Sequence, residues 1–328
     1  MADTLTIAPS DWLRYIRSEY TESFIRDGGS AIKFAVPFDD QAQADLVAGI
    51  TDAAREAGYL FAKVSAAETR VHMIDQLFFK IAEQMPWQAL SQRVLTSLAV
   101  SAGYAPPAPG DGTFIARLAE SNGVGIGMLQ MGLRPKIEND IFLSHKLARD
   151  FRVAVTQLCL AEISDGPDGP AGFEVITDWL TGRNKAIAAV RNYGIFTRIH
   201  RTNARYMFES LLHWARMAGY SGTIVALDLS RVSLQFNPRD GLIFYSKAAM
   251  FDAYEMLRQF IDATDTLKGL LMLVTTATAD QFLNLDANGR GLGAYEALKF
   301  RVFDEVRDVR LVNPMGALVR VRSDRSAR

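Results

Sequence analysis

The chain has 328 residues, of which 49% are hydrophobic and 22% are charged, a composition typical of a globular protein with a large core in one or two domains. Its formal net charge of −1 excludes a polycation that binds nucleic acid through the charge of the whole molecule, so any such surface must be local. The lone cysteine, Cys159, excludes an internal disulfide, and its apolar neighbours favour a small buried side chain over a nucleophile.

The ends and the histidines of the chain give no sign of export, membrane insertion or metal binding. The first residues lack a basic region followed by an apolar core, and no apolar run reaches the about 18–20 residues of a spanning helix. None of the four histidines lies at ligand spacing from another histidine or from the cysteine. We therefore expect a cytoplasmic protein with neither a membrane segment nor a metal site.

The first third of the chain alternates helix and strand. Apolar residues four apart predict an N-terminal helix within residues 1–30, which ends at a Gly-Gly pair. A buried strand at 31–36 follows, then a helix at about 40–57 and a second strand at 59–66. The pattern from about 67 to 196 is mainly helical and predicts an inserted helical subdomain.

Two Pro- and Gly-rich breaks, at 104–112 and 164–172, interrupt the helical region, and one long helix is predicted between them over 137–163. Helices and strands alternate again in the last third. The predicted elements are a helix at about 197–218, a strand at 222–229, a helix at 247–264, a strand at 269–278, a helix at 293–306 and a closing strand at 309–313. This alternation predicts an α/β domain over 31–328 with a mainly parallel sheet flanked by helices.

The junction after the first strand has the spacing of a phosphate-binding loop, G-x-x-x-x-G-K-[ST], but not its residue types. Pro37 and Ala42 stand at the glycine positions, Gln43 at the lysine position and Ala44 at the hydroxyl position. Proline has no N–H to donate, and neither glutamine nor alanine supplies a positive charge or a metal ligand. Taken alone, the segment is interpreted as a plain turn from strand to helix.

Two later strands end in residues that nucleotide-hydrolysing proteins use. The strand at 222–229 ends in Asp228, which would hold Mg²⁺, but Leu229 follows where a glutamate would orient the attacking water. The strand at 269–278 offers Thr275 and Thr276 as polar groups at its tip. Apolar runs that end in aspartate or threonine are common, so each signal is weak by itself.

Several segments together resemble the BREX-type ATP-binding proteins, AAA+ P-loop proteins of bacterial phage-defence clusters. The similar segments, in chain order, are EYTESFIRDGGSAIKFAV, DWLTGRNKAIAAVRNYGI, RTNARYMFESLLHWARMAGYSGTIVALD and RGLGAYEALKFRV. The resemblance implies an AAA+-like P-loop NTPase fold with an inserted helical subdomain. It also implies that the phosphate loop and the Asp228–Leu229 pair are degenerate.

We therefore interpret the chain as a pseudo-ATPase without a cofactor, which serves as a scaffold or binding subunit of a defence or DNA-transaction complex. The resemblance implies other protein subunits as partners, with an active ATPase, a helicase or a nuclease among the candidates. DNA binding and homo- or hetero-oligomers are compatible with it. The alternative is an active ATPase that binds ATP and Mg²⁺ through a non-standard loop. An enzyme of another class finds no support, because the sequence lacks a nucleophile elbow, a redox cysteine pair and a convincing dinucleotide fingerprint.

A run of basic residues stands out between residues 183 and 216, where seven Lys or Arg residues face a single acidic residue. Four of them are predicted to share one face of the helix at 197–218: Arg198, Arg201, Arg205 and Arg216. A solvated face with ion pairs is one interpretation, and contact with nucleic-acid phosphates or an acidic partner is the other.

Arg301 lies in the segment that, by the resemblance, would supply an arginine to a neighbouring subunit's nucleotide; the alternative is a surface ion pair. At the start of the helix near residue 40, Asp39 and Asp40 place carboxylates where a phosphate would otherwise meet unpaired N–H groups. We predict that one of these side chains accepts a hydrogen bond from an N–H group near Ala42 and so plugs the loop.

Overall fold

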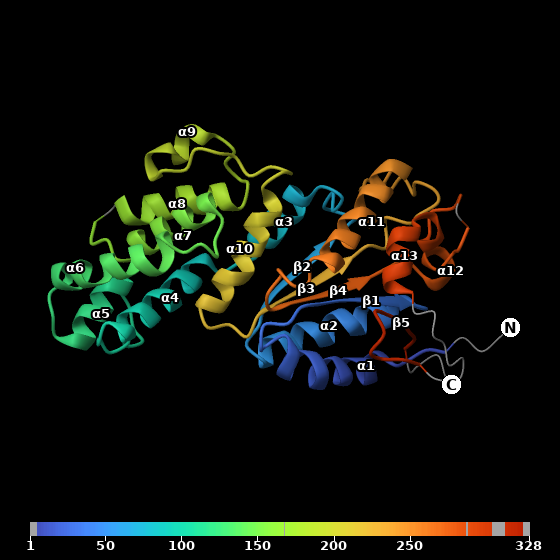
Figure 1. Ribbon diagram of the computed structural model, residues 1–328, viewed down its shortest axis with the longest axis horizontal. Helices are drawn as coiled ribbons and strands as arrows, with labels where there is room; N and C mark the ends of the chain where they lie inside the picture. Colours follow the sequence, from blue (N-terminus) through green and yellow to red (C-terminus); the bar gives the residue numbers. More distant parts are fainter. Residues whose placement is uncertain (1–4, 167, 287, 304–311, 324–328) are drawn as a thin grey trace. The chain divides into compact units, whose positions relative to one another are not determined.

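The computed structural model describes residues 5–166, 168–286, 288–303 and 312–323. The chain forms two compact units, one from Met1–Ile81 together with Tyr220–Arg328 and one from Ala82–Gly219. The first unit contains a β-sheet with helices on its faces, and the second is built of helices (Figure 1). The sequence predicts an inserted helical subdomain over about 67–196, whereas the helical unit of the structure spans Ala82–Gly219. No helix among the described residues combines the length and apolar character that crossing a membrane requires.

Within the described part of the chain, the sheet of the first unit has five parallel strands in the order β2-β3-β4-β1-β5. Their bounds are β1 Ala31–Pro37, β2 Leu60–Ser65, β3 Thr223–Asp228, β4 Leu270–Thr275 and β5 Leu318–Val321. Strands β1 and β4 are buried along their whole length, as expected where helices cover both faces of a parallel sheet. The predicted α/β fold with a parallel sheet is thus confirmed, and it is consistent with a P-loop NTPase-like fold.

Among the described residues, six α-helices lie in this unit, with the last residue of α3 in the second unit. They are α1 Pro9–Ile16, α2 Asp40–Glu56, α3 Ile74–Ala82, α11 Lys247–Asp262, α12 Ala279–Phe282 and α13 Glu296–Val302. A π-helical stretch, Arg17–Phe24, continues α1. Helices α1 and α2 cover one face of the sheet, and α11, α12 and α13 lie on the other (Figure 1).

Alternate residues of β1 point to these two faces because side chains alternate along a strand. Ala31 and Ala35 join the core beneath α1 and α2, where Trp12 is fully buried. Phe34 faces the opposite side and stacks on Phe282 of α12, with 6.4 Å between ring centroids. Small residues on one side and a large ring on the other allow α2 to approach the strand that precedes it.

Lys33 is the exception in β1, since it is a charged residue, only 5% exposed, within an otherwise apolar strand. Its Nζ donates to the carbonyls of Met315 (2.6 Å) and Gly316 (3.2 Å) and lies 4.5 Å from the centre of the Tyr20 ring. Burial lowers the pKa of Lys33 to about 8. The side chain therefore ties the turn before β5 to the centre of the sheet.

The second unit contains seven helices among its described residues: α4 Trp87–Ser101, α5 Phe114–Asn122, α6 Ile126–Ile137, α7 Arg149–Glu162, α8 Asp168–Leu180, α9 Ile187–Val190 and α10 Ala204–Met217. Helix α7 is the central one, with extensive packing against α4 and α8. Its side chains are buried on most sides, and Cys159 is among them. Burial raises the pKa of the Cys159 thiol far above its usual range, in keeping with a structural role.

The prediction of one helix over 137–163 is wrong. A π-helical turn, Glu138–Phe142, ends the first part, and α7 starts only at Arg149. Leu147, buried at 3% exposure, pulls the connecting turn inward, and the Ala148 N–H donates to the Ser210 hydroxyl at 2.8 Å. Tertiary contacts thus override a continuous helical pattern.

One boundary near a predicted break also differs from expectation. Helix α8 begins at Asp168, within the predicted break at 164–172, because Pro170 fits the first turn of a helix. The closing strand predicted at 309–313 lies largely outside the described residues. The described strand at this end of the sheet is β5, whose alternating burial matches one covered face.

Candidate functional site

The carboxyl ends of β1, β3 and β4 meet at one edge of the sheet, together with the start of α2. Cα pairing places Ala35 beside Thr275 and Thr275 beside Asp228. In parallel sheets, ligands bind outside the carboxyl ends of strands where the strand order reverses, and β1 lies at such a point between β4 and β5. The fold therefore brings the phosphate-loop positions, Asp228 and Thr275 together.

Asp39 is the N-cap of α2. Its backbone is extended (φ −149°, ψ 157°), and its Oδ1 accepts a hydrogen bond from the Ala42 N–H at 2.7 Å. Its Oδ2 accepts a second one from the Ser323 N–H at 3.2 Å. Burial opposes the charge, but these hydrogen bonds together hold the pKa of Asp39 below its ordinary value. The hydrogen bond predicted near Ala42 is thus confirmed, with Asp39 rather than the exposed Asp40 as the acceptor.

The remaining loop positions are engaged within the chain. The Phe38 N–H donates to the Val321 carbonyl at 2.9 Å, and Pro37 has no N–H. Ala42 is fully buried and Ala44 is exposed. The Gln43 amide, at the lysine position, donates to the Thr275 hydroxyl at 3.4 Å. The segment is therefore a capped strand-to-helix turn.

Asp228 also has partners inside the protein. Its Oδ2 accepts from the Ser65 hydroxyl at 3.1 Å, and its Oδ1 accepts from the Ser230 N–H at 2.9 Å. Leu229 is buried, and its N–H donates to the Thr275 carbonyl at 2.7 Å. Sequence reasoning missed Ser65, although a hydroxyl residue at the end of a strand is a signal that could have found it. The buried Thr276 hydroxyl donates to the Ala277 carbonyl at 2.9 Å.

Magnesium and ATP do not fit the residues at this edge. A phosphate at the start of α2 would compete with Asp39 for the Ala42 N–H and would meet its negative charge. No side chain of the loop supplies a compensating cation, since Gln43 stands at the lysine position. The described residues contain no group of three or more His, Cys, Asp or Glu side chains arranged to hold a metal ion.

The four predicted contact arginines do not share one helix face, so that prediction is wrong. Helix α10 begins at Ala204, and Arg198 and Arg201 lie in the turn before it. Asn203 stabilises this turn, because its side chain accepts from the His200 N–H (2.8 Å) and donates to the Arg198 carbonyl (2.9 Å). Met207 and Leu211 of α10 are buried.

The members of this arginine group differ in their surroundings. Arg205 forms an ion pair with Glu209 at 3.3 Å across one helical turn. Arg216, near the end of α10, is half-buried. Arg198 and Arg201 are exposed, and neither forms an ion pair with a described residue.

Arg301, near the end of α13, is engaged by its own chain. Its guanidinium donates to both carboxylate oxygens of Asp262 (2.5 and 2.9 Å) and to the Ala297 carbonyl (2.8 Å). The pKa of Arg301 is raised, chiefly by its hydrogen bonds to Asp262. A role for Arg301 in a neighbouring subunit would require it to leave this pair.

Comparison with known families identifies the relatives of this chain. The family model for the BREX system ATP-binding protein BrxC/D matches residues 142–324, which is more than half of the chain. The matched range includes β3, β4, β5 and Asp228, whereas the loop at 37–44 lies before it. No curated protein and no solved structure matches the chain. The chain belongs to the BREX system ATP-binding protein BrxC/D family.

Proposed function

We propose that this chain is a non-hydrolysing AAA+-like subunit of a cytoplasmic BREX-type phage-defence complex. In this proposal the fold is retained for its shape and for its contacts with other subunits or with DNA. Membership of the family supports a role in such a complex. An active ATPase, a helicase or a nuclease of the same complex is the expected kind of protein partner, in a homo- or hetero-oligomer.

The Asp39 cap is the observation that carries the proposal. In an ATP-binding loop, the N–H groups and the dipole at the start of the helix are complemented by phosphate. Here a carboxylate of the chain itself accepts the Ala42 N–H, and a hydrogen bond from Ser323 fixes it in place. The helix end is thus already neutralised, so a nucleotide gains little there and meets like charge.

Titration calorimetry of the purified protein with Mg²⁺-ATP tests the proposal. We expect no binding at micromolar nucleotide and no phosphate release above background. Micromolar affinity, or turnover that Asp228→Ala abolishes, would instead establish the alternative of an active ATPase with a non-standard loop. Asp252→Ala, which removes an aspartate from α11, is the matched control for that variant.

A further inference from the structure

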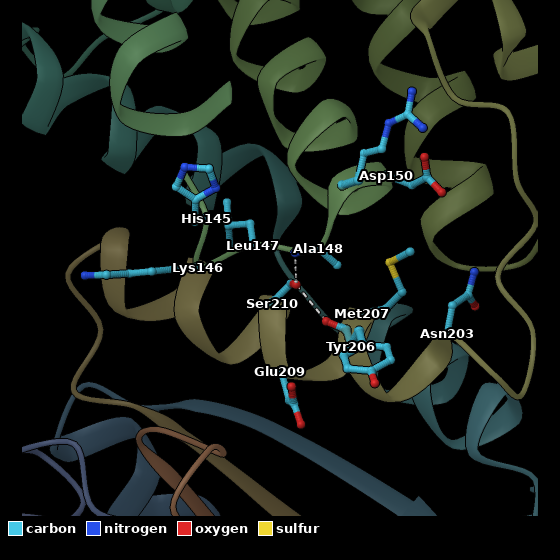
Figure 2. A pocket seen from close by; sticks show the side chains of 11 residues that line it. His145, Lys146, Leu147, Ala148, Asp150, Asn203, Tyr206, Met207, Glu209 and Ser210 are labelled. Atoms are coloured by element: carbon cyan, nitrogen blue, oxygen red, sulfur yellow. Dashed lines mark hydrogen bonds between the residues drawn. The ribbon is translucent and has the colours of Figure 1, made fainter. Parts of the chain in front are cut away.

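The helical unit carries two neighbouring hollows that the phosphate-loop region does not explain. The larger, of about 470 Å³, lies between the start of α7 and α10, and the smaller, of about 300 Å³, lies between α7 and residues 192–194. Both are lined by Arg149, so the two hollows adjoin. Figure 2 shows the larger one, with His145 and Ala148 on one wall and Tyr206 and Met207 on the other.

The walls of the larger hollow are fixed to one another by hydrogen bonds. The Ser210 hydroxyl accepts from the Ala148 N–H at 2.8 Å and donates to the Tyr206 carbonyl at 2.6 Å (Figure 2). The Thr197 hydroxyl donates to the Asp150 carboxylate, which joins the turn before α10 to α7. The surface is therefore built into the fold and does not need a ligand to form.

The two segments that border the hollows, 142–152 and 191–206, are strongly basic. They carry seven Lys and Arg residues against one acidic residue, Asp150. Lys146, Arg149 and Arg152 line the hollows themselves, and Arg191, Arg198, Arg201 and Arg205 belong to the second segment, which lines the hollows through other residues. Asp150 is engaged by Thr197, and Glu209 on the rim pairs with Arg205.

Several of these cations keep their charge available for a ligand. Among the described residues, Lys146, Arg149, Arg198 and Arg201 have no ion-pair partner. The local field is positive: burial first, then the charges of Lys146 and Arg216, lower the pKa of His213 in α10. A ligand with several negative charges fits this field.

Exposed aromatic rings lie among the cations. Tyr206, which lines the larger hollow, is 60% exposed, and Phe142, which lines the smaller one, is 40% exposed. Phe196, in the basic segment before α10, is 58% exposed. Binding an acidic peptide needs only the cations, whereas bases of an unpaired strand stack on such rings while its phosphates meet the arginines. In a duplex the base faces are covered, so the rings favour a single strand.

We propose that this surface binds single-stranded nucleic acid, with phosphates at Arg149, Arg198 and Arg201 and bases stacked on Tyr206 and Phe142. The inference rests on the proposed function because it assumes that the helical unit serves as a binding component of a defence complex. It does not depend on the state of the phosphate loop. The strand lies across both hollows, and Arg149 is the contact common to them.

Fluorescence anisotropy with a labelled oligothymidylate strand, in buffer without nucleotide, tests the inference. Tyr206→Ala is expected to weaken binding about tenfold, while Tyr206→Phe, which keeps the ring, preserves it. Reversing both Arg198 and Arg201 to Glu is expected to weaken binding at least tenfold. It also lowers the slope of log affinity against log salt by about 1.4, since each lost phosphate contact contributes about 0.7. Reversal of Arg14 and Arg55, two exposed arginines of the first unit, is the matched control and leaves binding unchanged.

Three results would overturn the inference. The first is that the protein does not bind the single-stranded oligonucleotide. The second is that it binds a duplex of the same length with equal affinity. The third is that the Tyr206 and arginine variants bind the single strand as tightly as the wild type does. If a polyglutamate peptide binds instead, with dependence on Arg198 and Arg201 but not on Tyr206, the surface recognises acidic protein. ATP binding at the phosphate loop would refute the proposed function without affecting any of these titrations.

Discussion

Replacing Asp39 by alanine should destabilise the first unit by about 2–3 kcal/mol. The change removes the N-cap of α2, which costs about 1 kcal/mol. It also leaves the Ser323 N–H without the charged acceptor that it meets at 3.2 Å, which costs about 1.5 kcal/mol more. Asp39→Asn keeps one oxygen that can cap the Ala42 N–H, but its amide group cannot accept from the Ser323 N–H as well, so it loses that hydrogen bond together with the charge at the helix end and should cost about 2 kcal/mol.

Urea denaturation followed by circular dichroism measures these changes, with Asp40→Asn as the control. Asp40 is exposed in the first turn of α2, so this control removes a charge beside the same helix end without removing the cap. The Asp39 pKa is lowered in the folded protein. Its stabilisation is therefore fully present above the ordinary aspartate pKa and is lost as the pH falls through the lowered value. Equal midpoints for Asp39→Ala and Asp40→Asn at pH 7 would refute the reasoning.

Two further predictions concern β1. Lys33→Met should raise stability at pH 7 by about 1–3 kcal/mol because it removes a buried ammonium. The folded pKa of about 8 lies below the unfolded value, so wild-type stability should rise with pH from about 8 to 10.5, and urea midpoints should show no such rise in the variant. Phe34→Ala should cost about 3–5 kcal/mol, since the ring is fully buried against Phe282, and a loss below 1 kcal/mol in the same assay would contradict this packing.

The elements of the sheet could be predicted because their signals are local. The run at 31–36 is apolar except for Lys33 and is followed by an aspartate that can cap a helix, and the structure places β1 and α2 there. The same holds for β3, whose apolar residues end at Asp228. In each case the strand is buried along most of its length, so its sequence is mainly apolar, with Lys33 as the exception in β1 and Thr223 at the start of β3.

The helix boundaries that the sequence predicts wrongly depend on contacts between residues far apart in the chain. Nothing near 143–148 marks the end of a helix, because the turn there is stabilised by Ser210 of α10. The start of α10 was placed too early for a similar reason. The Asn203 side chain folds residues 198–203 into a turn, while the apolar spacing around it remains helical.

At the candidate site, the sequence predicts a helix cap near Ala42 but not the contacts with residues far along the chain. Asp39 is three residues before Ala42, a spacing that permits the hydrogen bond. Its second donor, Ser323, is 284 residues away, and Gln43 meets Thr275 at a separation of 232. Such pairs follow from strand order, which alternation of helix and strand does not specify.

The order of the strands has a consequence for how the chain folds during synthesis. Strand β1 pairs with β4 and β5, whose residues follow it by roughly 240 and 284 positions, and neither β2 nor β3, the described strands made between β1 and β4, pairs with it. The contacts within Ala82–Gly219 are closer in sequence, so this unit can form while β1 still has two open edges. A nascent chain stalled before residue 270 would therefore expose an apolar strand that can pair with other chains. Until synthesis ends, the two open edges of β1 would need to be covered by another protein, such as a chaperone.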